Sequence, residues 1–336
     1  MNIQSTKSSS DIVRVEKAGL YCEAGDFYVD PWGPVSTSII THAHADHARV
    51  GAQKYYASNR SAPLLYHRLG TPLPLQTYDY GEKFKLKNAW VSFHSAGHIL
   101  GSSQVRIEVG NSVWVASGDY KRTPDPSCDP FEVVECDTFI SESTFALPIY
   151  HWESGQKTAE RIYKWWQQDR TRPSLIFCYA LGKAQRVLAE LKSYTDATIY
   201  LHGSMDRLTE IYREQGIDML PTKLVTEALT GHDFKGDLIL APPSAHRSPW
   251  MKRFKEPQTA FASGWMQVRG ARRRRGYEKG FVLSDHADWN ELNQTIKETK
   301  ASTVFLTHGR TETLDHYLTE KGLSVRHFET QYEDED

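Results

Sequence analysis

The chain has 336 residues, of which 39% are hydrophobic, 24% charged and 12% aromatic, and its formal net charge is −2 at pH 7. This length suits two domains, or one domain with a large insertion. The near-neutral charge neither requires nor excludes a nucleic-acid partner, so evidence for one must be local. The stretch MNIQSTKSSSD lacks the apolar core of a signal peptide, so none is expected, and the sequence has no apolar run long enough to span a membrane. Four cysteines without a CxxC pair are expected to be free thiols, and we expect a soluble cytoplasmic protein without a membrane partner.

Two short strands are predicted near the start of the chain, at Leu20–Cys22 and Phe27–Asp30, followed by a turn at Pro31–Gly33. Asp30 stands at the end of the second strand. An aspartate at such a point either forms the turn with its own side chain or serves a function, and the local pattern allows both interpretations.

A dense group of polar side chains follows the next predicted strand. The apolar run at Ile39 and Ile40 stops at Thr41, and His42, His44, Asp46 and His47 come directly after it. Neutral imidazoles and carboxylates are the ligands that suit zinc and similar metals. His42 and His44, two residues apart on extended chain, would project to one side, whereas the later pair can reach a second position nearby. A chance cluster on a surface loop is the alternative, and the tight spacing argues against it.

Further candidate ligands also stand after predicted strands. The strand Ala89–His94 leads through small residues to His98, and a hairpin formed by Gln104–Val109 and Ser112–Ala116 ends at Asp119. A carboxylate can bridge two cations with its two oxygens, which one imidazole cannot do. These residues could therefore join the first cluster at one edge of the sheets.

Three more side chains of this kind follow later strands. The strand Asp137–Glu142 ends at Glu142, which in isolation would be a solvated strand end. His286 comes between the predicted strand Phe281–Leu283 and a helix at Trp289–Glu298, and His308 follows the last strand, Thr303–Thr307. The acidic end of the sequence, Tyr332–Asp336, is expected to be solvated.

The pattern changes between about Leu147 and Gly280, where predicted helices and strands alternate. A helix at Lys157–Gln168, a strand at Ser174–Tyr179 and a helix at Lys183–Lys192 begin this series. Such alternation predicts a mainly parallel sheet with helices on its faces, in a segment too long for a loop. We therefore expect three parts: residues 1–146 and 281–336 form the first domain, and residues 147–280 form an inserted domain.

The expected inserted domain contains two basic features. Gly182 and Lys183 lie between a strand end and a helix start, where backbone N–H groups and a cation can hold a phosphate. An arginine-rich run lies near Trp265 and Tyr277 and could bind phosphates while the rings stack on bases. Its members are Arg269, Arg272, Arg273, Arg274 and Arg275. The alternative is a solvated basic loop.

These motifs together carry a resemblance to a known family. HAHADH at residues 42–47 matches the HxHxDH signature of the metallo-β-lactamase superfamily. Glu142, His286 and the stretch FCYALGKAQRVL resemble the β-CASP branch, which contains nucleases of DNA and RNA. The resemblance extends over nearly the whole chain. It implies an α/β protein, an αββα metallo-β-lactamase sandwich with an inserted α/β β-CASP domain.

The resemblance also assigns roles to residues. It implies two divalent ions, the first held by His42, His44, His98 and Asp119, and the second by Asp46, His47, His308 and the same Asp119. Asp30 is then the residue that orients the ligands. His286 protonates the departing oxygen and Glu142 holds it, because a neighbouring carboxylate favours the protonated imidazole. The histidine-rich set favours zinc, with manganese as the alternative at one position.

Three stretches resemble more narrowly the bacterial ligase-associated DNA exonucleases: VDPWGPV, SGWMQVRGARRRR and GFVLSDHADW. This likeness implies a two-metal phosphodiesterase that degrades single-stranded DNA from its 5′ end in repair, with a DNA ligase or helicase as a functional associate. One residue departs from the pattern, because the DNA-acting relatives often have an aliphatic residue in place of His308. A histidine there is more usual in the RNA-cleaving members, so an RNA-processing ribonuclease is the alternative.

Two other classes share part of the pattern. A small-molecule hydrolase of the lactamase or glyoxalase type has the metal motifs but lacks the inserted domain, the Glu142–His286 pair and the arginine run. An inactive nucleic-acid-binding scaffold of the β-CASP type usually loses metal ligands, and here all seven are present.

Overall fold

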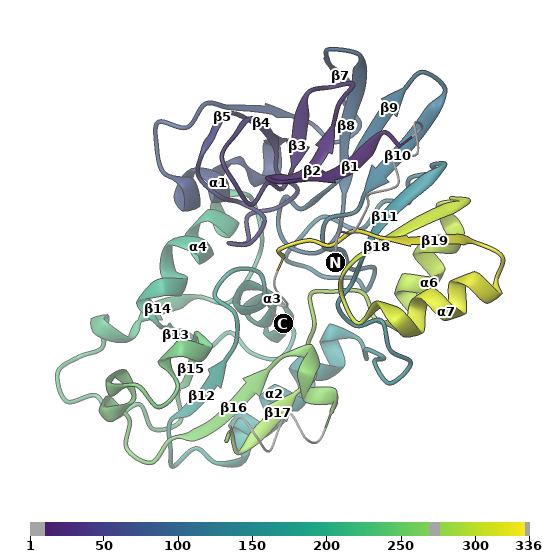
Figure 1. Cartoon of the computed structure of the whole chain (residues 1–336). Coiled ribbons are helices and arrows are strands. Elements are labelled where there is room, and N and C mark those ends of the chain that lie inside the picture. Colours follow the sequence, from purple (N-terminus) through teal and green to yellow (C-terminus); the bar gives the residue numbers. More distant parts are fainter. Residues whose placement is uncertain (1–10, 269–275, 333–336) are drawn as a thin grey trace.

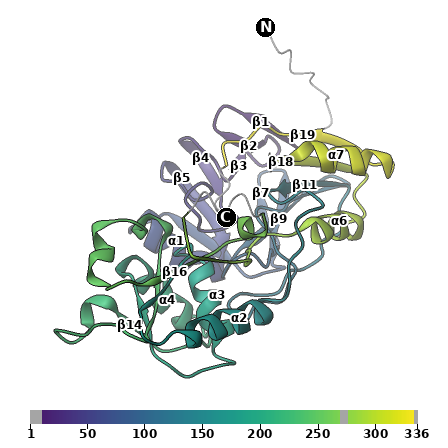
Figure 2. The ribbon, with the colours of Figure 1, turned by 90° about the horizontal axis from the view of Figure 1, so that it is seen from below.

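The computed structural model describes residues 11–268 and 276–332. In these ranges the strands form three sheets (Figure 1). Two sheets face each other in the upper part of the view, and the third lies below them with its own helices. The same separation is visible from below (Figure 2). No helix in the described ranges is both long and apolar enough to cross a bilayer.

The first sheet carries one helix on its outer face. Its strands run in the order β1 (Val13–Glu16), β2 (Gly19–Cys22), β3 (Phe27–Val29), β4 (Val35–Ile39), β5 (Ala52–Ser58) and β6 (Leu75–Tyr78). Successive side chains of a strand point to opposite faces. Tyr56 therefore packs toward the second sheet, whereas Tyr55 and Ala57 pack outward against α1 (Ala62–Leu69), which follows the short 3-10 turn η1 (Asn59–Ser61).

The second sheet is mixed and carries two helices. Its strands, in spatial order, are β19 (Ser324–His327), β18 (Thr303–Gly309), β11 (Thr138–Ser143), β10 (Ser112–Ala116), β9 (Ser103–Val109), β8 (Ala89–Ser95) and β7 (Phe84–Leu86). Trp114 and Phe305 point into the core shared with the first sheet. Val115 and Val304 point to the other face, against α6 (Trp289–Glu298) and α7 (Thr311–Glu320).

The two sheets and their helices thus form four layers. One hydrophobic cluster joins the inner faces of both sheets, and the helices cover the outer faces. This is the αββα sandwich that the sequence predicts.

The third sheet is parallel throughout. Its strands, in spatial order, are β14 (Thr222–Leu224), β13 (Ile199–Leu201), β15 (Leu238–Ala241), β12 (Ser174–Phe177), β16 (Gln258–Ala262) and β17 (Lys279–Phe281). The long helices α2 (Gly155–Gln168), α3 (Lys183–Leu191) and α4 (Gly203–Glu214) share one cluster with one face of this sheet. The other face packs against the 3-10 turns η3 (Pro243–Ala245), η4 (Pro249–Arg253) and η5 (Gly264–Gln267), while η2 (Val225–Glu227) follows β14.

The last strand of this sheet differs from the expected one. The sequence predicts a strand at Phe281–Leu283 in the first domain, but β17 ends at Phe281 and pairs with β16 in the third sheet. Edge strands are short and weakly patterned, which makes their limits hard to predict. The chain therefore leaves the third sheet after Phe281, and residues 282–288 lead directly to α6.

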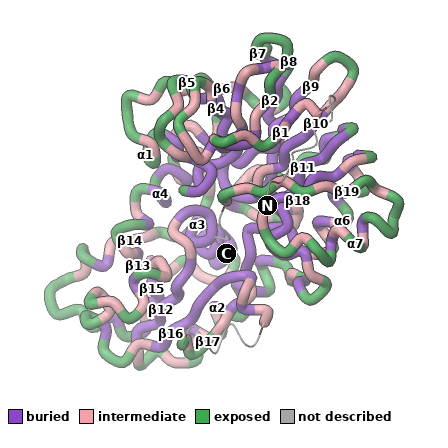
Figure 3. The backbone as a smooth tube through the Cα atoms, viewed as in Figure 1, coloured by how far each residue is buried: buried purple, intermediate pink, exposed green. Residues whose placement is uncertain are grey.

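The inserted part of the chain is packed firmly against the sandwich. All nine residues of α3 are buried, and Figure 3 shows α3 among the buried segments between the sandwich and the third sheet. One cluster contains Ile40, Leu64 and Leu100 from the sandwich together with Leu188 of α3. The side chain of Arg60 also donates to the Gln215 carbonyl oxygen just after α4, at 3.0 Å. These contacts place α3 and the loop before it next to the ends of the first-domain strands.

We predict that Trp166→Ala destabilises the protein by about 3–5 kcal/mol. Trp166 is 2% exposed, and its indole N–H donates to the Gly236 carbonyl oxygen at 2.8 Å, so the substitution leaves a cavity and an unsatisfied carbonyl. Urea unfolding followed by circular dichroism measures the change. Leu229→Ala is the matched control, because Leu229 is 84% exposed and should change stability by less than about 0.5 kcal/mol. Equal midpoints for the two variants would contradict the packing described.

Candidate metal centre

A cluster of buried polar side chains lies where several strands of the sandwich end. His42 and His44 follow β4, His98 follows β8, Asp119 follows β10, and His308 lies near the end of β18. The three strands β10, β11 and β18 are parallel neighbours, so their carboxyl ends meet at one edge. The structure therefore brings these residues together although they are far apart in the sequence.

The first predicted ligand set is compact. One ligand atom from each of His42, His44, His98 and Asp119 lies within 4.8 Å of all the others. His44 Nδ1 is 3.0 Å from His98 Nε2, and Asp119 Oδ2 is 3.5 Å from His42 Nε2 and 3.8 Å from His98 Nε2. Zinc–nitrogen bonds of ordinary length place tetrahedral donors about 3.3 Å apart. The observed spacing is therefore close to that of a four-coordinate site.

The electrostatics of this set also suit a cation. Burial lowers the pKa of His42 and of His98 well below the usual histidine value, and neighbouring histidines lower both further. Both imidazoles are thus neutral near pH 7 and keep a lone pair for a metal. His42 Nε2 is buried and has no hydrogen-bond partner within the described ranges. An orphaned buried nitrogen of this kind is costly unless something binds it, so the residues fit a divalent metal ion.

The second predicted set is arranged around the same carboxylate. His47 Nε2 is 3.3 Å from Asp46 Oδ2 and 3.5 Å from Asp119 Oδ2, and His308 Nε2 is 3.4 Å from Asp119 Oδ1. One oxygen of Asp119 therefore faces the first set and His47, and the other faces His308. This is the arrangement that a carboxylate needs in order to touch two neighbouring cations.

Asp30 supports this second set from behind. It is 1% exposed, its Oδ2 is 2.7 Å from His47 Nδ1, and it accepts hydrogen bonds from the backbone N–H and the hydroxyl of Thr41. Burial by itself would lower the pKa of His47, but Asp46, Asp119 and Asp30 outweigh burial and raise this pKa well above the usual value. The same negative surroundings would stabilise a divalent cation.

His286 and Glu142 form a buried pair beside the first set. His286 Nδ1 is 2.9 Å from Glu142 Oε2, and Glu142 Oε1 accepts a hydrogen bond from the Tyr120 N–H at 2.7 Å. One ligand atom from each of Asp119, Glu142 and His286 lies within 4.8 Å of the others. The indole N–H of Trp152 donates to the His286 carbonyl oxygen at 2.8 Å. The contacts with Glu142 and Trp152 therefore hold His286 at the edge of the cluster, beside Asp119.

The predicted substrate-binding residues are placed differently. Lys183 is 2% exposed and lies 3.7 Å from Asp285 Oδ2, not at the surface where a phosphate could reach it. A buried carboxylate needs a nearby cation, which accounts for this position. The predicted phosphate-binding arginines, Arg269, Arg272, Arg273, Arg274 and Arg275, lie outside the described residues.

Tyr332 is a site residue that the sequence analysis missed. Its ring stacks on His47, with centroids 4.4 Å apart and planes 17° apart, and meets His308 edge-on at 5.6 Å. Its hydroxyl donates to the Asp30 carbonyl oxygen at 3.3 Å. The expectation that this residue is merely solvated is therefore wrong for Tyr332. A tyrosine beside acidic residues has no local pattern that would have revealed a contact made through the tertiary fold.

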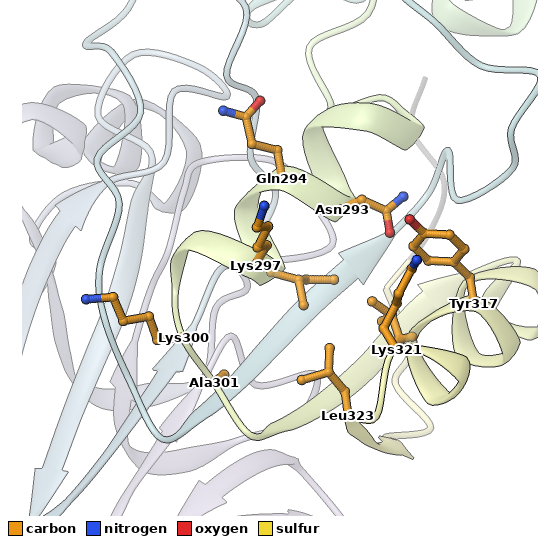
Figure 4. Close-up of a pocket in the computed structure, with 10 residues that line it drawn as sticks. Asn293, Gln294, Lys297, Lys300, Ala301, Tyr317, Lys321 and Leu323 are labelled. Atoms are coloured by element: carbon orange, nitrogen blue, oxygen red, sulfur yellow. The ribbon is translucent and has the colours of Figure 1, made fainter.

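A groove of about 710 Å³ lies between α6 and α7 (Figure 4). Lys297, Lys300 and Lys321 line it, each in or just after the last turn of a helix. Lysines at such positions offset the negative end of the helix dipole. Lys300 is also paired with Glu135, and Lys321 lies over the Tyr317 ring. These lysines therefore have a structural explanation, and none of the predicted site residues lines the groove.

Comparisons with known proteins agree with this geometry. No family model matches the chain. It is 28% identical over 311 residues to a protein of Opitutus terrae named "Probable DNA ligase", covering 91% of this chain and 30% of that protein. It is 27% identical over 212 residues to an RNase J-like protein of Methanocaldococcus jannaschii, covering 53% of this chain and 50% of that one. The chain thus spans between about a third and a half of these curated relatives. These similarities indicate a relationship to the family of metallo-β-lactamase β-CASP nucleases.

A solved structure resembles the whole arrangement. A protein of unknown function from Enterococcus faecalis V583 matches with a TM-score of 0.60 and 12% identity, covering 89% of this chain and 80% of that one. This likeness concerns the fold alone. The predicted fold class, an αββα metallo-β-lactamase sandwich with an inserted α/β β-CASP domain, is confirmed. The exact domain limits remain a prediction.

We predict that Tyr332→Ala lowers the affinity for one of two Zn²⁺ ions by up to about tenfold, the lower end of the effect of residues that support metal ligands. The substitution removes the ring that stacks on His47. Competition with a chelator of known affinity measures the change. Tyr332→Phe is the control, since it keeps the ring and should stay near wild type. Equal affinity in all three proteins would contradict a role for this ring.

Proposed function

We propose that this protein is a two-metal phosphodiesterase that degrades single-stranded DNA from its 5′ end. The observation that carries the proposal is Asp119, which lies between two histidine-containing sets: one oxygen is near His42 and His47 and the other is near His308. The His286–Glu142 pair lies beside it. A small-molecule hydrolase would need no such pair and no inserted domain packed against the cluster. The similarity to nucleases supports a nucleic acid as the substrate.

Each group in the cluster then has a task. His42, His44, His98 and Asp119 would hold one ion, and Asp46, His47, His308 and Asp119 would hold the other. Zinc fits the histidine-rich set, with manganese as an alternative at one position. Divalent ions at such a site lower the pKa of a water molecule and neutralise charge that develops on phosphoryl oxygens.

The protein groups supply the remaining chemistry. His286, oriented by Glu142 at 2.9 Å, gives a proton to the departing sugar oxygen. Asp30 keeps His47 in place through its 2.7 Å contact with Nδ1. Because all these side chains are buried or nearly so, they are held in a fixed geometry before substrate arrives.

The choice of DNA rests on one similarity, and RNA has its own support. The relative that covers 91% of this chain is named as a DNA ligase, which favours DNA and a repair role in association with a DNA ligase or helicase. In contrast, His308 lies 3.4 Å from Asp119, where it can act as a ligand as in the RNA-cleaving members. RNA processing is therefore the second candidate function.

One assay distinguishes these possibilities. End-labelled single-stranded DNA and RNA, each with a phosphate at either the 5′ or the 3′ end, are incubated with the protein and Zn²⁺ or Mn²⁺. We expect stepwise shortening of 5′-phosphorylated DNA. Internal cleavage or a preference for RNA would support the ribonuclease, and no cleavage of any substrate would support a binding scaffold.

Two substitutions separate metal binding from proton transfer. We predict that His286→Ala slows cleavage by about 10²–10⁴-fold, the usual contribution of a general acid, while both metal ions stay bound. Asp46→Ala should abolish cleavage and remove one ion, with the fold retained. Metal content by atomic emission and cleavage rates measure both effects. Loss of metal from His286→Ala, or normal cleavage by Asp46→Ala, would show that the roles are misassigned.

We further predict that replacing Arg272–Arg275 together with Ala weakens oligonucleotide binding and its salt dependence. Four phosphate contacts to a single strand give a slope of about −3 when the logarithm of affinity is plotted against the logarithm of salt concentration. Fluorescence anisotropy with EDTA present measures binding without cleavage. Replacing surface lysines Lys297 and Lys321 is the control for a general loss of charge. An unchanged slope in the arginine variant would make the run a solvated loop.

A further inference from the structure

Two candidate metal ligands contact parts of the chain outside the sandwich sheets through the ring nitrogen that points away from the metal centre. His44 and His98 face each other through Nδ1 and Nε2, 3.0 Å apart. Their other ring nitrogens contact backbone carbonyls: His44 Nε2 lies 3.3 Å from the Leu181 oxygen, and His98 Nδ1 lies 2.7 Å from the Asp285 oxygen. Such contacts fix the tautomer and the ring orientation of a metal-binding histidine.

Both carbonyls belong to the inserted part of the chain or to its exit. Leu181 lies in the loop between β12 and α3, and Asp285 lies in the segment that returns from β17 to α6. Neither Leu181 nor Asp285 belongs to the strands β4 and β8 that precede His44 and His98. The orientation of His44 and His98 therefore depends on how the inserted part docks.

A buried charge cluster fixes these two segments against the sandwich. Arg186 of α3 is 2% exposed, donates to the Ser284 carbonyl oxygen at 2.6 Å, and lies 3.7 Å from Asp285 Oδ1 and 3.3 Å from Asp125 Oδ2. Lys183 lies 3.7 Å from the other oxygen of Asp285. Asp125, in the first domain, is paired at 2.5 Å with Lys121. The cluster thus joins the first domain, α3 and the returning segment.

Buried ion pairs of this kind add little net stability, because their desolvation offsets most of the attraction. What they can supply is a defined geometry. A second observation points the same way: Gly182, next to Leu181, has φ +89°, and a Cβ there would come within 2.4 Å of Ile99 Cγ2. Only glycine allows the Leu181 loop to approach the loop of His98 this closely.

We infer that Asp285, Lys183 and Arg186 are positioning residues, through which the docked inserted domain orients His44 and His98 for metal binding. The inference rests on the proposed metal centre and adds a role for the inserted domain besides contacting substrate. Metal binding and docking of the inserted domain are then thermodynamically coupled, so that each strengthens the other.

The test uses Asp285→Asn and Gly182→Ala in the full chain, with Co²⁺ as the metal. Asp285→Asn keeps the side-chain shape and the backbone carbonyl but removes the charge that faces Lys183 and Arg186. Gly182→Ala perturbs the Leu181 loop without changing any charge. We expect each to lower Co²⁺ affinity by about 10–100-fold and to alter the visible absorption bands of bound Co²⁺, which depend on ligand geometry.

Arg60→Gln is the matched control. It removes other contacts between the sandwich and the inserted part, those of Arg60 with Gln215 at 3.0 and 3.2 Å, and touches none of the candidate ligands. It should leave both Co²⁺ affinity and spectrum near wild type. An equal loss in Arg60→Gln would overturn the inference in favour of a general docking effect.

Two further outcomes separate this inference from the nuclease proposal. Wild-type Co²⁺ affinity and spectrum in folded Asp285→Asn and Gly182→Ala would overturn the inference and leave the nuclease proposal standing. A wild-type protein that binds no Co²⁺ would overturn both. Circular dichroism shows that each variant is folded, and if Asp285→Asn does not fold, Gly182→Ala carries the test.

Discussion

Asp119 is a buried carboxylate that several histidines approach from distant parts of the chain. His42 and His98 lie near one of its oxygens and His308 near the other, at 3.4–3.8 Å. Burial alone would raise the pKa of this carboxyl, but the positive charge of His47, 3.5 Å away, and the contact with His308 hold it well below its usual range. A buried charge of this kind is tolerated only with opposite charge close by. The ends of β4, β8, β10 and β18, which carry these residues, must therefore lie close together. The packing of the two sheets brings them there.

The second constraint is the docking of the inserted part. Its long helices α2, α3 and α4 pack on one face of the parallel sheet, and α3 lies wholly buried between that sheet and the sandwich. The charge cluster around Arg186 and Asp285 crosses the same boundary. The sandwich supplies the side chains of the candidate metal centre, whereas the inserted part and the segment that returns from it each supply one backbone carbonyl that contacts a histidine of the centre.

Much of the fold could be predicted because local patterns determined it. β9 and β10 form the predicted hairpin, with Val109 opposite Ser112 on either side of the turn at Gly110, and Asp288 caps α6 by accepting from the Glu291 N–H at 2.9 Å. The sequence analysis did not predict β1, β5, β6, α1, α7 or β19. β1, β6 and β19 are four-residue strands at sheet edges, whereas β5 has seven residues and pairs with β4 and β6. The apolar patterns of α1 and α7 are weaker than those of α2 and α6. The predictions for Lys183, as a substrate-binding residue, and for Tyr332, as a solvated one, failed for another reason. The residues that contact them, Asp285 and His47, are distant in the sequence.

The strand order of the second sheet has a consequence for how the molecule is made. β11 and β18 are parallel neighbours, with Ile140 opposite Phe305, yet the whole inserted part lies between them in the chain. On the ribosome, β11 emerges early with all six residues destined for burial, and it waits for its partner until the third sheet has been translated. Long-range parallel pairing of this kind is slow and leaves an open apolar edge exposed meanwhile. The insertion therefore delays closure of the sandwich, and His308 is the last histidine of the candidate metal centre to reach its place.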